Sequence, residues 1–207
     1  MDVPTYGPLT SKQRYVLSRL KAWTAEGHKS ICYADSPTAV GIYVRELEKA
    51  GLEAVAFHGK QTIHARTRDM NRRFRYGNAP VMVASKDCIE KGLNIWQASR
   101  GILAARDWSH TKEDQMMRRL LRPQQTKLVE FECVNLRGSI DEYQQQMTLM
   151  KGDSAGAAID FLTPETEHME FVHLDQILAR FVDDLKERAG FEGHNFREQL
   201  RGVALAA

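Results

Sequence analysis

Short apolar runs alternate along the chain with segments in which apolar residues recur every three or four positions. The short runs predict β-strands, and the periodic segments predict amphipathic helices. The predicted strands cover residues 30–34, 54–57, 80–85, 101–105 and 127–134. Helices are expected from Ser11 onward, from 36–37 to Gly51, up to Phe74, and near 111–122 and 139–151.

Residues that favour helix ends mark several of these boundaries. Ser11 can cap the first helix, and Ser36 followed by Pro37 marks the start of the second. A serine hydroxyl accepts a hydrogen bond from a free N–H group of the first turn, and proline suits the first helical position. In the third helix, three apolar residues are expected to form the buried side: Ile63, Met70 and Phe74.

The order of the elements predicts an α/β fold. Strands that alternate with helices at this spacing form a mainly parallel sheet with helices on both faces. Ligands of such folds lie at the loops that leave the carboxyl ends of the strands. Function is therefore expected at the loops that begin near Asp35, His58, Ser85 and Asp107.

The alternation stops near residue 152, which predicts two parts. Residues 1–155 are expected to form the α/β domain, and residues 156–207 a linker and a C-terminal helical extension. Apolar residues between Leu174 and Leu185 recur at helical spacing, so this extension is predicted to contain one amphipathic helix.

Charge is distributed unevenly along the chain. The net charge is +2, but from Asp160 onward ten acidic residues face five basic ones, so the rest of the chain carries about +7. A basic body indicates a polyanionic partner, and solvated charge without a partner is an equally good explanation of this feature alone.

Cysteine usage and hydropathy narrow the class of protein. The three cysteines, Cys32, Cys88 and Cys133, are isolated in apolar stretches, which predicts buried free thiols and an intracellular, cytoplasmic protein. No apolar run is long enough to cross a bilayer, so no membrane partner is expected. The seven histidines show no paired spacing, and no metal site is predicted.

The segment DWSHTKEDQMMRRLLRPQ, residues 107–124, is the strongest chemical signal. If it is helical, Gln115, Arg119 and Arg122 lie at i, i+4 and i+7 and share one face. Two guanidinium groups on one face suit the binding of a phosphate chain, because arginine binds phosphate oxygens in pairs and stays charged. An exposed basic helix that pairs with its own acidic residues is the alternative.

A second group of basic residues gathers around the predicted third helix. Arg68, Arg72 and Arg75 recur at i, i+4 and i+7, opposite the expected buried side. This face is either a solvated outer surface or part of a track for a nucleic-acid backbone. Polar residues at the neighbouring strand ends would join such a track: Ser36, His58, Lys60, Arg66, Ser85 and Lys86. The contacts would be independent of base sequence.

Five segments resemble motifs of superfamily-2 helicases of the Swi/Snf type, in the family's order, over about residues 10–155. SICYADS occupies the place of motif IV, and FHGKQTIHAR resembles the Gly-Ser-x5-Arg segment, with lysine in place of serine. VASKDCIEKGLN resembles motif V, and the DW…Q…R…R segment resembles motif VI. LRGSIDE resembles the turn before the closing helix. The family's Gly-Gly pair in motif V is replaced by Ile89 and Glu90.

This resemblance implies the second RecA-like lobe of a DNA-dependent ATPase. Arg119 and Arg122 would then reach the phosphates of ATP across a cleft between two lobes, and Gln115 would help orient them. Gly92 and Asn94 would face the nucleotide, since a glycine lets the backbone approach it closely. The implied partner is the DNA backbone, and a bacterial or viral origin is expected rather than a nuclear one.

Two parts of a complete ATPase site are missing from this sequence. No G-x-x-x-x-G-K-[ST] loop is present, and no Asp-Glu pair of the DEAH kind occurs. The resemblance therefore implies that ATP and Mg²⁺ are bound mainly by a first RecA-like lobe, in the same parent chain or in a separate subunit. The isolated chain is expected to be inactive. A catalytically silent nucleic-acid-binding or adaptor module on the same scaffold is the alternative.

Overall fold

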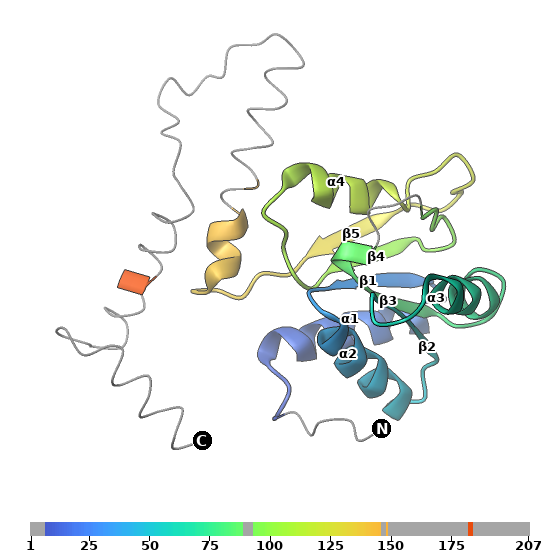
Figure 1. Ribbon diagram of the computed structural model, residues 1–207, viewed down its shortest axis with the longest axis horizontal. Helices are drawn as coiled ribbons and strands as arrows, with labels where there is room; N and C mark the ends of the chain where they lie inside the picture. The colour runs from blue at the N-terminus through green and yellow to red at the C-terminus, as the bar shows by residue number, and fades with distance from the viewer. Residues whose placement is uncertain (1–6, 89–92, 146–147, 149–181, 184–207) are drawn as a thin grey trace, which may run out of the picture. The chain divides into compact units, whose positions relative to one another are not determined.

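The computed structural model describes residues 7–88, 93–145, 148 and 182–183. Five strands form one sheet in the order β2-β3-β1-β4-β5, and every neighbouring pair is parallel (Figure 1). The predicted parallel sheet is thereby confirmed. The strands are β1 (Ser30–Ala34), β2 (Ala54–Phe57), β3 (Val81–Ser85), β4 (Arg100–Leu103) and β5 (Glu130–Cys133).

Helices cover both faces of the sheet, as the sequence predicts. The helical elements are α1 (Ser11–Ala25), α2 (Pro37–Lys49), α3 (Ile63–Asp69), the π-helix η1 (Met70–Arg75), the short 3-10 helix η2 (Lys86–Cys88) and α4 (His110–Arg118). Figure 1 shows α1 and α2 on one side of the sheet and α4 on the other. Residues 140–145 begin a further helix after β5.

In the four strands β1 to β4, alternate residues belong to two separate cores, because successive strand side chains point to opposite faces. In β1, Cys32 and Ala34 join the core under α1 and α2. Ile31 and Tyr33 join the core that includes residues of η1 and α4. Burial on both faces explains why inner strands such as β1 and β3 are continuous apolar runs in the sequence rather than alternating patterns.

The first two helices begin close to where the sequence places them. Ser36 caps α2 through its hydroxyl, which accepts from the N–H group of Ala39 at 3.2 Å, and Pro37 is the first helical residue. The cap of α1 is Thr10 rather than Ser11. Thr10 and Gln13 form a reciprocal capping box, and this pair satisfies two N–H groups where a lone serine would satisfy one.

The predicted third helix changes character halfway. Hydrogen bonds of the i to i+5 type, such as that from the Tyr76 N–H to the Asn71 carbonyl at 2.9 Å, widen it into η1. The wider turn disrupts the expected side-chain faces. Met70 and Phe74 are buried as predicted, whereas Ile63 is 68% exposed, and that part of the prediction is wrong.

The arginine-bearing helix is shorter than predicted. α4 ends at Arg118, Arg119 is its C-cap, and Arg122 lies beyond the helix. The expected helix over 111–122 is therefore wrong at its end, and Gln115, Arg119 and Arg122 do not share one helical face.

The chain divides into two compact units, Met1–Ala155 and Gly156–Ala207. The fold described above belongs to the first. In the second unit only 182–183 are described, and they are helical. The predicted linker and amphipathic extension otherwise lie outside the described residues, so the proposed domain division stays a prediction.

Candidate nucleotide and nucleic-acid interface

The parallel sheet brings the expected loops to one edge. The strand order reverses between β1 and β4, because β3 lies on one side of β1 and β4 on the other. Ligands of open α/β sheets bind at such a reversal, outside the carboxyl ends of the strands. A cavity of about 350 Å³ opens there, and it is lined in part by Ala34 and Asp35 at the end of β1 and by Ala104 and Arg106 after β4.

Hydrogen bonds tie the end of α4 to the segment 94–98, which precedes β4. The Ile95 N–H donates to the carbonyl of Arg119 at 3.1 Å. The side-chain amide of Gln125 donates to the carbonyls of Trp96 and Ala98, both at 2.8 Å. These contacts place Asn94 and Arg119, two predicted nucleotide-site residues, on segments that touch each other. Gln125 was missed by the motif reasoning, although it follows the arginines closely.

The predicted phosphate-binding residues differ in exposure. Gln115 is exposed, and Arg119 and Arg122 are half-buried. The Nε atom of Arg122 is buried and has no hydrogen-bond partner among the described residues. Asn94 is half-buried, and its side-chain oxygen is likewise buried without a hydrogen-bond partner among the described residues. Gly92 lies outside the described residues.

Two acidic residues of α4 form ion pairs with Arg118 and Arg106. Asp114 binds Arg118 at 2.6 Å, on the exposed side of the helix. Glu113 is buried and binds Arg106, also buried, at 2.9 Å. The alternative of a basic helix that pairs with its own acidic residues is thus met in part, by Asp114 and Arg118.

Glu113 also fixes the start of α4. Its carboxylate accepts a hydrogen bond from the N–H group of Asp107 at 2.8 Å, and the carboxylate of Asp107 accepts from the N–H group of Ser109 at 3.0 Å. Ser109 is the N-cap of α4. Burial raises the pKa of Glu113, and the bond from Asp107 and the charge of Arg106 oppose this rise.

His58 and Arg66 meet at the carboxyl end of β2. The guanidinium group of Arg66 lies 5.1 Å from the ring centre of Phe57, 3.5 Å from the His58 carbonyl and 3.3 Å from the Cys88 sulfur. This cluster joins the loop after β2 to η2. Burial lowers the pKa of His58, and the cations Lys60 and Arg66 lower it further.

The remaining predicted track residues lie at the same edge in different environments. Lys60 is exposed, and Ser85 is buried at the end of β3. The hydroxyl of Ser36 caps α2, as described above. The ammonium group of Lys86 lies 2.9 Å from the Arg106 carbonyl and 3.2 Å from the Asp35 carboxylate.

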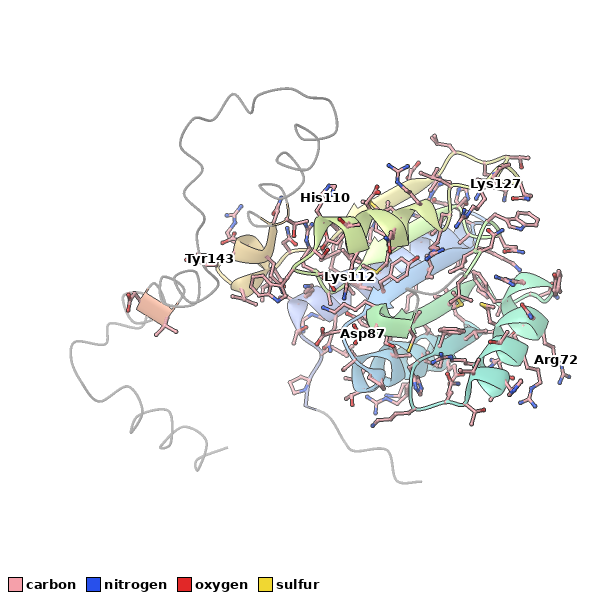
Figure 2. All side chains as sticks on the ribbon, turned by 45° about the horizontal axis from the view of Figure 1, so that its top comes forward. Arg72, Asp87, His110, Lys112, Lys127 and Tyr143 are labelled. Atoms are coloured by element: carbon pink, nitrogen blue, oxygen red, sulfur yellow. The ribbon has the colours of Figure 1, made fainter. Side chains whose placement is uncertain are left out.

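The arginines of α3 and η1 do not form the expected continuous face. Arg68 and Arg72 are exposed, and Arg72 points away from the sheet in Figure 2. Arg75 turns inward, where its guanidinium group donates to the carbonyl of Asn94 and, at 3.1 Å, to Asn71. The π-helical turn explains the difference, since i, i+4 and i+7 no longer align there.

Three further observations concern thiols, metals and membranes. All three cysteines are free, as predicted, but only Cys32 is buried, whereas Cys88 is half-buried and Cys133 exposed. Among the described residues, no group of three His, Cys, Asp or Glu side chains could hold a metal ion. No helix in the described ranges has both the length and the apolar character needed to cross a membrane.

Comparison with known proteins gives the family. The fold is similar to the crystal structure of the C-terminal part of the Fun30 ATPase domain, with a TM-score of 0.61 and 16% sequence identity. That match covers 74% of this chain and 55% of the other, so this chain corresponds to little more than half of the longer one. Residues 11–124, over half of the chain, match the helicase conserved C-terminal domain. The chain therefore belongs to the family of helicase conserved C-terminal domains and has its RecA-like α/β fold.

Proposed function

We propose that this chain is the second lobe of a DNA-dependent ATPase of the Swi/Snf type, and that Arg119 and Arg122 act on the phosphates of ATP. The observation that carries the proposal is the junction between α4 and residues 94–98. The bond from the Ile95 N–H to the Arg119 carbonyl joins the residue directly after the segment that resembles motif V to the segment that resembles motif VI.

The chemistry of the junction fits a phosphate chain. Negative charge develops on the transferred phosphoryl group, and a guanidinium group stabilises it through paired hydrogen bonds. The buried Nε of Arg122 is a donor without a hydrogen-bond partner among the described residues, which a phosphate oxygen would supply. Gln115, exposed on α4, would help orient this group, and Gly92 and Asn94 would face the nucleotide.

The rest of the active site is proposed to come from a first RecA-like lobe. A Walker loop and the carboxylates for Mg²⁺ are not present in this sequence. Mg²⁺ neutralises charge on the β- and γ-phosphates in such sites, and the first lobe would hold it. Trp96 and Leu121, which are 38% and 58% exposed and belong to the two joined segments, supply apolar surface that a partner lobe could cover.

DNA is the proposed second ligand, held through its phosphates. His58, Lys60 and Arg66 supply cations or donors at the end of β2, and Ser36 and Ser85 supply hydroxyl and N–H donors at the ends of β1 and β3. No aromatic residue interleaves with them in these loops, so contacts to the backbone rather than stacking on bases are expected. Lys86 is left out of this track because its ammonium group already binds acceptors within the chain.

The test is hydrolysis of ATP with and without a first lobe. The chain alone should hydrolyse no ATP above background, and joined to its cognate first lobe it should show DNA-stimulated hydrolysis. In that complex, Arg122→Ala should lower kcat by about two orders of magnitude or more, which is roughly 3 kcal/mol of transition-state stabilisation. Affinity for ATP should change much less, because most of the ground-state binding comes from the other lobe.

Arg118→Ala is the matched control. Arg118 belongs to the same helix end, but its side chain is 70% exposed and binds Asp114, so its removal should be mild. Robust hydrolysis by the isolated chain, or a joined enzyme indifferent to Arg119 and Arg122, would refute the proposal. DNA binding without hydrolysis in the joined complex would favour the adaptor alternative.

A further inference from the structure

The side chain of Lys86 connects the carboxyl ends of three strands, β3, β1 and β4. It begins η2 directly after β3, and its side chain is only 14% exposed. Its ammonium group donates to the Arg106 carbonyl at 2.9 Å and lies 3.2 Å from the carboxylate of Asp35 and 3.9 Å from that of Asp107. Asp35 follows β1, and Arg106 and Asp107 follow β4. The lysine therefore crosses the point at which the strand order reverses.

The segment that Lys86 holds is the β4–α4 loop, residues 104–109. Glu113 also binds this loop, through the side chain of Arg106 and the N–H group of Asp107. The hydroxyl of Thr148 donates to the Asp107 carbonyl at 3.1 Å. In Figure 2, the label Asp87 lies on η2, and the labels His110 and Lys112 lie at the start of α4. Lys86 and the β4–α4 loop connect these two elements.

We infer that Lys86 is a positioning residue, which fixes the β4–α4 loop and through it α4 with Gln115 and Arg119, and that it is not a contact to nucleic-acid phosphates. The loop leads directly into the cap of α4 at Ser109, so a shift of the loop moves the helix start. The functional part of this inference rests on the proposed role of the arginines.

Electrostatics separate the two roles. A phosphate brought to Lys86 would meet the carboxylates of Asp35 and Asp107, and repulsion would oppose it. Asp35 is 68% exposed in its side chain, so it faces the solvent from which the phosphate would arrive. Lys60 offers a contrast, because it is an exposed cation at a neighbouring strand end.

The first test is structural and needs no activity. With 5-fluorotryptophan in the full chain, ¹⁹F NMR follows Trp108, which lies in the β4–α4 loop, and Trp23, a buried residue of α1. Lys86→Met should shift the Trp108 resonance and leave that of Trp23 in place, and Lys86→Arg should largely restore it. Lys60→Met should move neither. An unchanged chemical shift of Trp108 in Lys86→Met would overturn the inference.

The second test is binding of duplex DNA as a function of salt. Lys86→Met should leave the affinity and its salt dependence unchanged, whereas Lys60→Met should weaken binding and reduce the salt slope by about one. A reduced slope in Lys86→Met would show a lost phosphate contact and would also overturn the inference. If Lys86→Met lowers the melting temperature, the Trp108 resonance and the salt dependence of DNA binding are compared between the unchanged protein and Lys86→Arg instead.

The third test concerns hydrolysis by the chain joined to its first lobe. Lys86→Met should lower kcat about tenfold or more with little change in the KM for ATP, and Lys86→Arg should recover most of the loss. An unchanged kcat would overturn the functional part. If Trp108 responds to Lys86→Met but hydrolysis is indifferent to Arg122→Ala, the proposed function fails and the positioning of the loop by Lys86 stands.

Discussion

Gly101 is the position at which adding one carbon atom should disturb the link between the sheet and α4. Gly101 of β4 pairs with Phe131 of β5 in the sheet register. A Cβ atom on Gly101 would lie 2.3 Å from two ring carbons of Phe131. That ring stacks on Tyr33 of β1 at a centroid distance of 5.9 Å, and the Tyr33 hydroxyl donates to the Met116 carbonyl of α4 at 3.0 Å.

Gly101→Ala should therefore displace the Phe131 ring and destabilise the fold. Overpacking costs about 1–3 kcal/mol. Loss of the aromatic pair adds about 0.5–1.5 kcal/mol. The smaller entropy of the unfolded chain offsets about 0.4–1 kcal/mol. The net loss in the free energy of unfolding should be about 2 kcal/mol, because the ring carbons are too close for a small adjustment to relieve the contact.

Urea denaturation of the full chain measures this change, and two comparisons sharpen it. Gly41 is an exposed glycine within α2 with no heavy atom within 4 Å of an added Cβ, so Gly41→Ala should stabilise the fold by about 0.5–1 kcal/mol. In a Phe131→Ala background, Gly101→Ala should cost almost nothing, since the clash is gone. An equal cost with and without the Phe131 ring would refute the reasoning.

Two further predictions concern Lys29 and His58. The Lys29 ammonium group donates to the carbonyls of Phe74 and Gly77 at 2.5 and 2.6 Å and so fixes the end of η1. Lys29→Met should therefore lower the free energy of unfolding by about 1–3 kcal/mol, measured by urea denaturation. Lys21→Met, on the exposed side of α1, is the control and should leave the free energy of unfolding unchanged. The pKa of His58 lies below its ordinary value of 6.5, so a bound phosphate that raises it must bind more tightly as the pH falls. DNA affinity should rise between about pH 7.5 and 5.5, and His58→Gln should reduce that rise; identical pH profiles for the two proteins would show that no phosphate lies near His58.

The arrangement of the fold is largely a local property of this sequence. Buried strands need continuous apolar runs and helices need a 3.6-residue period, so the order of elements and the parallel sheet follow from the pattern of side chains alone. The same order places Asp35, His58, Ser85 and Asp107 at one edge, because parallel strands end on the same side. Caps such as Ser36 are also local, since their partners lie within one turn.

The end of α4 and the role of Lys86 could not be predicted in this way. Pro123 predicts that the helix stops before it, but the helix ends at Arg118, and the following segment is tied to residues 94–98 through Arg119 and Gln125. The sequence distance between these partners is about as long as a whole βα unit. Only chain folding brings them together.

Ion pairing at the strand ends is likewise a tertiary property. Lys86 reads in the sequence as a cation free to bind phosphate, and its acceptors, Asp35 and the Arg106 carbonyl, come from other strand ends. Arg75 shows the same effect, because the Asn94 carbonyl and the π-helical turn draw it inward from its predicted outer face. The sequence by itself determined which residues are charged and which edge of the sheet they reach. The tertiary structure decided which of these charged side chains can still bind a ligand. Side chains such as Lys86 already bind acceptors that are distant in sequence and near in space.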